Sequence, residues 1–145
     1  MDVYIRQANE SDLPKIRDLL VIHGLPVEGV EQHINNFFAA VTDNVIVGTI
    51  VLKVYGIFGL LRSAAIHPDY QNKGNGSKLY DKLIQHAKSL NMKEIYLLTT
   101  TAEKYFLRKG FTKIDRDAVA PEVKLSDEFT GACPASAVCM MLKLY

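Results

Sequence analysis

Hydrophobic positions alternate with a period of two along some segments of the chain and recur at helical spacing along others. Val3–Ala8 alternates, which predicts a first strand. The polar cluster Asn9–Asp12 is typical of a helix start, and Pro14 falls in the first turn, where its missing N–H costs little. The apolar residues that follow at helical spacing are Leu13, Ile16, Leu19 and Leu20. A strand followed by an amphipathic helix therefore opens the chain.

The middle of the chain is rich in strand-forming residues. Phe37–Thr42 and Val45–Tyr55 flank the polar pair Asp43-Asn44, which predicts a hairpin. Gly56 interrupts the apolar run, and Ile57–Ile66 predicts a further strand. The pattern of Val27–Asn36 is compatible with a helix, a loop or a mobile lid, and it does not decide among them.

The second half of the chain alternates helices and strands. Gln71–Gly76 opens an amphipathic helix, and Asn91 is a plausible C-cap. The apolar face of this helix is expected to carry Leu79, Leu83, Ala87 and Leu90. The elements predicted after it are a strand at 94–99, a short helix at 101–109, a strand at 111–115 and a closing strand at 138–144. We expect the long irregular stretch 116–137 to be packed and ordered, because it carries Pro121, Val123, Leu125 and Phe129.

This order of elements, β-α-(α)-β-β-β-α-β-α-β-loop-β, predicts an α/β layered domain. The chain has 145 residues, which is about the size of one domain, so we assign 1–145 to a single domain. Charge says little about partners, because 17 basic and 16 acidic residues leave a net charge of +1. We therefore expect neither nucleic acid nor a membrane as partner, and a homodimer is left open.

The sequence shows no pattern typical of a signal peptide, a disulfide framework or a zinc site. The start of the chain lacks the pattern of a signal peptide, so a cytoplasmic location is expected. The two cysteines, Cys133 and Cys139, should then remain reduced and form no disulfide. The histidines at 23, 33, 67 and 86 show no zinc-type spacing, so no metal is predicted, and we interpret each as structural.

The glycine-containing loop Gln71–Gly76 lies between a predicted strand and the start of a predicted helix. Unpaired amide groups at a helix start, with glycines that allow close approach, suit a phosphate or pyrophosphate. Lys73 and Lys78 add positive charge nearby. The loop does not match a Walker motif or a Gly-x-Gly-x-x-Gly motif, and by itself it could be an ordinary strand-to-helix turn.

Two separated markers make the chain similar to a known family. Ala64–Gly76 resembles the acetyl-CoA signature of the GNAT (Gcn5-related) N-acetyltransferases, and Ala102–Phe111, ending in Lys-Gly-Phe, resembles the family's second marker. The resemblance covers about residues 3–115. It implies an acyl-CoA N-acyltransferase fold, with a mixed, mostly antiparallel sheet, splayed strands and helices on both faces.

The resemblance also implies which residues hold acetyl-CoA, the expected co-substrate. Strand residues Ala64, Ala65 and Ile66 would pair with the pantetheine arm through their backbone. Loop residues would wrap the pyrophosphate: Gln71, Asn72, Lys73, Gly74, Asn75, Gly76 and Ser77. Phe106 would pack on the pantetheine and Arg108 would contact a CoA phosphate, although core packing and a solvated basic face are the alternatives.

Three further segments resemble a narrower group, the small acetyltransferases found with arsenic-resistance genes and often labelled amino-acid N-acetyltransferases. These segments are Leu60–Ser63, Tyr96–Glu103 and 133–140. The resemblance implies direct acetyl transfer to the primary amine of a small acceptor, one that carries a carboxylate, without a covalent enzyme intermediate. Two alternatives are an acyl-CoA-binding regulatory or degenerate module and a peptide N-terminal acetyltransferase.

The catalytic groups are not evident from the sequence. The strand before the loop carries no acid on either face, so Glu28, Glu31 or Glu103, or a chain of waters, would have to serve as base. The family's usual acid position, four residues before Gly-Phe, is Phe106 here; the preceding Tyr105 is a weak substitute, since one residue turns a helix by about 100°.

Arg62 is the most informative single residue, because it places a charge inside an apolar strand. It could reach the surface or pair with an acid within the fold. As a functional group, its planar fork suits a substrate carboxylate. We predict Arg62, Ser63 and Ser136 as acceptor-binding residues, with Ser136 also a weak catalytic candidate; packing and turn roles are the alternatives for the two serines.

Overall fold

The computed structural model describes residues 3–25, 27, 29–126, 129 and 136–144. Its strands are β1 (Tyr4–Gln7), β2 (Phe37–Thr42), β3 (Val45–Tyr55), β4 (Phe58–Ile66), β5 (Glu94–Thr99), β6 (Thr112–Lys113) and β7 (Val138–Lys143). Its α-helices are α1 (Leu13–Ile22), α2 (Asn75–Ser89), α3 (Glu103–Arg108) and α4 (Pro121–Lys124). Short 3-10 turns are η1 (Glu10–Asp12), η2 (Val30–Asn36), η3 (Pro68–Tyr70) and η4 (Arg116–Ala118).

The strands hydrogen-bond in the order β1-β2-β3-β4-β5-β7-β6. The pairs β1/β2, β2/β3, β5/β7 and β6/β7 are antiparallel, and β4/β5 is parallel. This confirms the predicted α/β class with a mixed, mostly antiparallel sheet. The parallel register runs only from Phe58↔Glu94 to Leu60↔Tyr96, which leaves the second half of β4 outside that pairing.

Contacts within the chain divide it into two compact units. Unit 1 comprises Met1–Lys53 and Arg62–Ala87, and unit 2 comprises Val54–Leu61 and Lys88–Tyr145. Unit 1 contains β1, β2, most of β3, the end of β4, α1, η2 and most of α2. Each unit is described below by itself.

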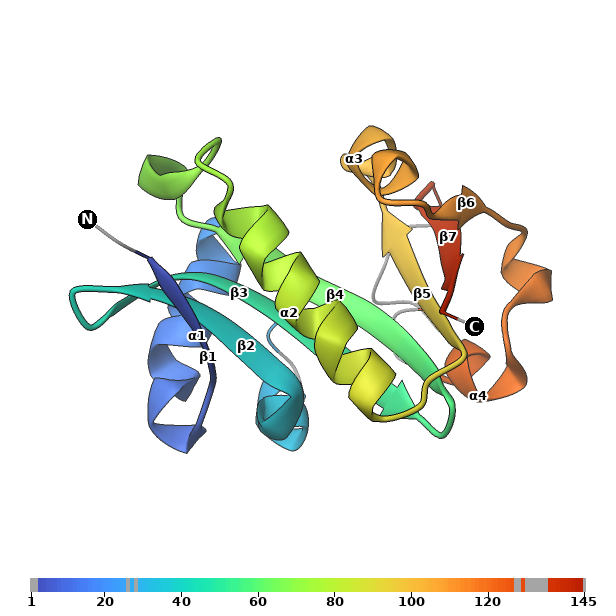
Figure 1. Cartoon of the computed structure of the whole chain (residues 1–145), viewed down its shortest axis with the longest axis horizontal. Helices are drawn as coiled ribbons and strands as arrows, with labels where there is room; N and C mark the ends of the chain where they lie inside the picture. The colour runs from blue at the N-terminus through green and yellow to red at the C-terminus, as the bar shows by residue number, and fades with distance from the viewer. Residues whose placement is uncertain (1–2, 26, 28, 127–128, 130–135, 145) are drawn as a thin grey trace. The chain divides into compact units, whose positions relative to one another are not determined.

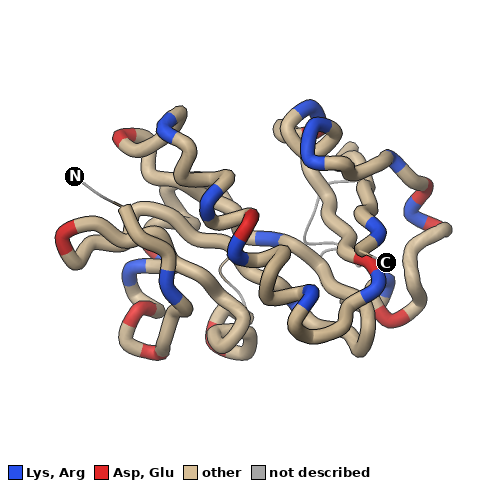
Figure 2. The backbone as a smooth tube through the Cα atoms, in the orientation of Figure 1, with Lys and Arg blue, Asp and Glu red and all other residues tan. Residues whose placement is uncertain are grey.

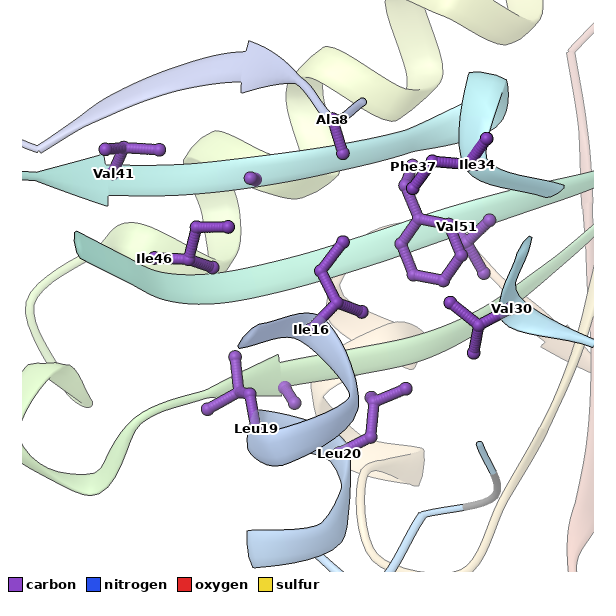
Figure 3. Close-up of a cluster of buried hydrophobic side chains, with 12 residues drawn as sticks. Ala8, Ile16, Leu19, Leu20, Val30, Ile34, Phe37, Val41, Ile46 and Val51 are labelled. Carbon is purple, nitrogen blue, oxygen red and sulfur yellow. The ribbon is translucent and has the colours of Figure 1, made fainter. Parts of the chain in front are cut away.

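Helix α1 packs on one face of the unit 1 strands (Figure 3). Ile16, Leu19 and Leu20 are at most 3% exposed and point toward the strands. Their partners come from β2, β3, β4, η2 and the residue that follows β1: Ala8, Val30, Ile34, Phe37, Ala39, Val41, Ile46, Val51 and Ala65. The helical spacing read from the sequence is therefore the spacing that buries one stripe of α1.

Helix α2 runs along the other face of these strands (Figure 1). A Cβ built on Gly48 of β3 would lie 2.6 Å from Ile66 Cδ1 and 3.1 Å from Leu79 Cδ1, so a glycine lets α2 approach closely. Leu79, Leu83 and Ala87 are at most 1% exposed, as predicted. The prediction for Leu90 is wrong: α2 ends at Ser89, and Leu90 is 43% exposed.

Unit 2 has its own cluster of buried side chains. Val119, Ala120 and Val123 from the irregular stretch after β6 pack with Tyr96 and Cys139. The described part of that stretch is therefore packed, as expected, but Leu125 is 81% exposed. Burial and a 2.7 Å hydrogen bond to Glu94 raise the pKa of Tyr96 to about 12, and burial raises the pKa of the Cys139 thiol.

Two local features confirm the predicted turns and caps. Asp43 and Asn44 have φ of +49° and +62°, the left-handed pair typical of a two-residue hairpin turn. Asn9 forms a capping box with Asp12 before α1. Arg6 also donates to both oxygens of Asp12, at 2.7 and 2.9 Å, so one carboxylate joins β1 to the helix start.

Other elements are shorter than the sequence predicted. The undecided segment 27–36 contains the 3-10 turn η2, the predicted strand 111–115 is reduced to Thr112–Lys113, and the predicted helix 101–109 is reduced to Glu103–Arg108. The predicted cap at Thr99–Thr101 is wrong: Ala102 is the N-cap of this helix, without a side-chain cap bond, and Thr99 Oγ1 accepts from Ala102 N at 2.9 Å in the turn before it.

Candidate functional site

The glycine loop leads from η3 into α2 with two left-handed residues. Asn72 has φ of +61° and Gly74 has φ of +81°. The first backbone hydrogen bond of the helix runs from Lys78 N to Gly74 O at 3.2 Å. The N–H groups before Lys78 therefore precede the regular hydrogen-bond pattern of the helix. A Cβ built at Gly74 or Gly76 would meet nothing within 4 Å. The loop surface is open there, which suits the approach of an anion.

Two side chains of the loop support its shape. Gln71 Nε2 donates to Ile66 O at 2.9 Å, and the buried Asn75 donates to Tyr70 O at 3.0 Å. Lys73 is exposed, with its Nζ 5.8 Å from the Tyr70 ring centre. Of the predicted loop residues, Gln71 and Asn75 therefore use their side-chain amides within the chain, while the backbone of 72–77 forms the open surface.

Strand β4 carries a backbone irregularity at Ser63. Its φ is +54°, in the left-handed region, which is uncommon for any residue other than glycine. The Ser63 carbonyl accepts from Thr49 Oγ1 at 3.0 Å, and its hydroxyl accepts from Arg62 Nε at 3.2 Å. The plain alternation expected along 60–66 is thus interrupted at Ser63, in the manner of a β-bulge.

Arg62 and Ser63 line a small open pocket inside unit 1. The pocket encloses about 180 Å³, counting the solvent-open space at its mouth. Its wall also contains the start of β2, the first half of η2 and the second half of β3. The lining residues are Gly29, Val30, His33, Phe37, Val51, Lys53, Arg62 and Ser63. The sequence prediction placed only Arg62 and Ser63 at such a site.

The pocket wall is basic at its polar positions. Lys53 is 4% exposed and Arg62 is half-buried, so two cationic side chains share one small hollow. None of the lining residues in the described parts of the chain carries a carboxylate. Cationic groups held in a partly buried apolar wall suit an anionic guest, most simply a carboxylate.

The start of η2 is held by backbone and by an ion pair. Gly29 caps it with φ of +78°, and Gln32 N donates to Gly29 O at 3.1 Å. Glu31 accepts from Arg17 of α1 at 3.0 Å. Hydrogen bonds from its own backbone amide and from Arg17 lower the pKa of the Glu31 carboxyl. The sequence-based base candidate Glu31 is therefore exposed and engaged with α1, and it does not line the pocket.

Three predicted residues lie on α3 in unit 2. Phe106 is buried and packs against Phe111 with ring centres 5.4 Å apart. Tyr105 is half-buried under Lys109, whose Nζ lies 5.5 Å from the ring centre, and Arg108 is exposed. Figure 2 shows several basic positions on and after this helix. Glu103 pairs with Lys113 at 3.4 Å.

The remaining candidates divide between described and undescribed positions. Ser136 is an exposed turn residue before β7. Glu28 and Cys133 lie outside the described residues, so the base candidate and the expectation about a disulfide stay predictions. Cys139 is buried.

The described residues contain neither a cluster of metal ligands nor a helix able to cross a membrane. They contain no group of three or more His, Cys, Asp and Glu side chains arranged to hold a metal ion. Among them, too, no helix combines the length and the apolar character that crossing a membrane requires.

With the loop, the bulged strand and the pocket described, the chain can be compared with known proteins. The model of the acetyltransferase (GNAT) family matches residues 6–111, which include all of these features. The chain belongs to the GNAT family. The GNAT match ends at Phe111, the last residue of the second marker recognised in the sequence.

Curated relatives of this GNAT chain are longer proteins. An amino-acid acetyltransferase of Buchnera aphidicola (subsp. Schizaphis graminum) is 34% identical over 131 residues, which are 83% of this chain and 29% of the relative. The amino-acid acetyltransferase of Escherichia coli K12 is 30% identical over 129 residues, with the same two coverages. The chain thus spans less than a third of the length of the curated relatives it matches.

Solved structures share the GNAT fold. N-acetylglutamate synthase from Neisseria gonorrhoeae, complexed with coenzyme A and N-acetyl-glutamate, has a TM-score of 0.85 at 24% identity and covers 100% of this chain and 36% of its own. Rv2747 from Mycobacterium tuberculosis, in complex with CoA, has a TM-score of 0.82 at 24% identity and covers 98% and 99%. At this identity the likeness concerns the fold.

Two titratable residues of this GNAT pocket were not identified from the sequence. Lys53 stands at the end of an apolar strand, where a charge is as unusual as Arg62 is in β4, and that signal was available. His33 lies in the segment whose secondary structure could not be decided. It lines the pocket.

Proposed function

We propose that the chain is an N-acetyltransferase domain, spanning residues 1–145, that moves the acetyl group of acetyl-CoA to the primary amine of a small, carboxylate-bearing acceptor such as an amino acid. The observation that carries this proposal is the basic pocket beside the bulge of β4. Arg62 and Ser63 line it, and Ala64–Ile66, the segment expected to meet the pantetheine arm, follows them directly along the strand.

The cofactor half of the proposal rests on the loop. Backbone amides of residues 72–77 would bind the CoA pyrophosphate, because they lie ahead of the helical ladder of α2 at its positive end. Lys73 and Lys78 are exposed beside them and would add charge. GNAT family membership supports this assignment, as does the open space at Gly74 and Gly76.

The acceptor half rests on the pocket's charge. Arg62 would hold the acceptor carboxylate through its planar fork, and Lys53 would add a second cation in the same hollow. Relatives named amino-acid acetyltransferase support the same acceptor class.

The chemistry would be direct transfer. The carboxylate contact orients the amine toward the thioester, and this positioning lowers the barrier without a covalent enzyme intermediate. Arg62 Nε already donates to the Ser63 hydroxyl at 3.2 Å, so one side of the guanidinium is held before an acceptor arrives.

A thiol-release assay with acetyl-CoA tests the proposal over a panel of free amino acids, their carboxamides and short peptides. Free amino acids should react, and the matching carboxamides should react at least about tenfold more slowly, because they lack the charge that Arg62 would bind. CoA binding with no turnover of any amine would favour the degenerate, regulatory module. Preference for peptides would favour the peptide N-terminal acetyltransferase.

A further inference from the structure

The proposed transfer needs a group that removes a proton from the acceptor. Near neutral pH an aliphatic amine is mostly an ammonium ion, which has no lone pair to attack the thioester. The faces of β4 supply no carboxylate, Glu31 is exposed and paired with Arg17, and Glu103 pairs with Lys113 in unit 2. A base among the described residues would therefore lie on the pocket wall.

The polar side chains of that wall differ sharply in their ability to accept a proton. An arginine stays protonated, a lysine has an ordinary pKa of about 10.4, and a serine hydroxyl does not gain a proton near neutral pH. A histidine has an ordinary pKa of about 6.5, so it is mostly neutral at pH 7 and still basic enough to take a proton. Among the described lining residues, His33 is the histidine.

The geometry of η2 directs His33 toward the pocket. A 3-10 turn repeats every three residues, so Val30, His33 and Asn36 lie along one side. Val30 is 3% exposed and lines the pocket with His33, and Asn36 contacts His86 of α2 at 3.0 Å. The side of η2 that carries His33 is thus fixed to the core at one end and to α2 at the other.

Two cationic side chains share the pocket wall with His33. They are Lys53 of β3 and Arg62 of β4. Glu31, the carboxylate of η2 itself, accepts from Arg17 of α1 at 3.0 Å. His86 of α2 is partly buried, and its pKa is lowered by that burial.

An amino acid bound by Arg62 would bring its ammonium group close to His33. The amine and the carboxylate of an α-amino acid are attached to the same carbon, so fixing one confines the other to the same small hollow. We infer that His33 is the general base of the proposed transfer, a conclusion that rests on the proposed function.

The step balances as follows. His33 accepts one proton from the acceptor ammonium, and the amine lone pair forms the C–N bond to the thioester carbonyl carbon. The C–S bond breaks, and its electron pair leaves on the CoA sulfur. The second amine proton goes to that sulfur, and the imidazolium releases the first to solvent. The products are the amide, the CoA thiol and one proton.

The test compares His33→Asn and His33→Gln with the wild-type chain, using the amino acid that the panel identifies. We expect kcat to fall about 100-fold near neutral pH, the lower end of what general-base catalysis contributes, with KM for the amino acid and CoA affinity within about threefold. The loss should shrink above about pH 9, where the amine deprotonates unaided, and added imidazole should restore part of the rate.

His86→Asn is the matched control, because it also removes a histidine that contacts η2 but lies outside the pocket lining. It should keep the wild-type pH profile. Thermal unfolding identifies any variant that does not fold, and in that event the wild-type kcat decides: it must rise with pH through the imidazole range.

Three results would overturn the inference while leaving the proposed function intact. The first is wild-type turnover whose kcat does not rise with pH through the imidazole range. The second is a His33 variant with the kcat and pH profile of the wild type. The third is a Glu28→Gln variant that loses the rise of kcat with pH while the His33 variants keep it. If the wild-type chain acetylates no amine at all, the proposed function fails, and His33 has no reaction to serve.

Discussion

Arg62 and Lys53 place two long cationic side chains at the wall of a pocket whose remaining surface is largely apolar. Burying a cation without compensation costs several kcal/mol, so such positions are kept where the charge has a use. Both residues make further interactions within the chain. A guest carboxylate would be an additional partner for these cations.

Arg62→Lys and Arg62→Ala test this at the level of one side chain. Lysine keeps the charge but loses the planar fork, so both variants should lose about 2–4 kcal/mol in kcat/KM for the amino acid. CoA affinity, measured by calorimetry, should hardly change. Arg17→Lys, on the exposed ion pair of α1, is the control and should turn over within about twofold of wild type. Wild-type kinetics in both Arg62 variants would make Arg62 a structural residue.

At the scale of an element, the start of α1 depends on one carboxylate. Asp12 is 7% exposed, accepts from Asn9 N at 2.9 Å and forms a two-pronged ion pair with Arg6. The Arg6 hydrogen bond, opposed by desolvation and assisted by the Asn9 amide, lowers the pKa of the Asp12 carboxyl. This element therefore couples strand β1, the cap and the helix through a titratable group.

Asp12→Asn should destabilise the fold by about 1 kcal/mol at neutral pH, a value reduced because Arg6 is partly exposed to solvent. The pKa of the Asp12 carboxyl is lower in the folded chain than in the unfolded chain. The contribution of Asp12 to the free energy of unfolding is therefore complete above the unfolded-state pKa, and it is lost as pH falls through the folded-state pKa. Urea unfolding should therefore show a gap between wild type and variant at pH 7 that narrows below about pH 4. Asp18→Asn, exposed on the same helix, should show no such gap.

At the scale of the whole molecule, the features that the proposed reaction requires belong to one compact unit. The loop before α2, the segment Ala64–Ile66 and the basic pocket all fall within unit 1, whose segments are Met1–Lys53 and Arg62–Ala87. Ligand binding to the loop should thus stabilise the native chain by mass action, since the unfolded chain lacks the arrangement.

Acetyl-CoA at about 100 times its Kd should add about 2.7 kcal/mol and raise Tm. Gly74→Ala should abolish most of that rise, because φ of +81° is strained for alanine and the loop would shift. Gly24→Ala is the matched control: its φ is +66° and its surroundings are equally open. It should lower the Tm of the free chain slightly and keep the full rise. No shift in the wild type would contradict CoA binding.

Much of this architecture could be predicted because its signals are local. The hairpin follows from Asp43-Asn44, whose side chains tolerate the left-handed region, and α1 and α2 follow from apolar spacing. Leu90 and Leu125 were misassigned because exposure depends on where the chain goes next, and α2 ends one residue before Leu90.

The sequence predicted one part of the candidate site and missed another. The loop and Arg62 have recognisable local patterns, whereas the pocket joins η2, β2, β3 and β4 through long-range pairing. His33 and Lys53 meet there only because β3 turns back along β4 and η2 packs over both. No spacing within the sequence encodes that meeting.

The left-handed backbone at Ser63 limits how the acceptor pocket can be redesigned. A randomised library at this position would be dominated by residues that disfavour φ of +54°, above all the β-branched ones, so its usable members reduce to Gly, Asn, Asp and the existing Ser. Glycine would relieve the strain but remove the hydroxyl that accepts from Arg62. Attempts to evolve a new acceptor preference would gain more from varying Val30, Phe37 and Val51, whose side chains shape the same hollow from ordinary backbone.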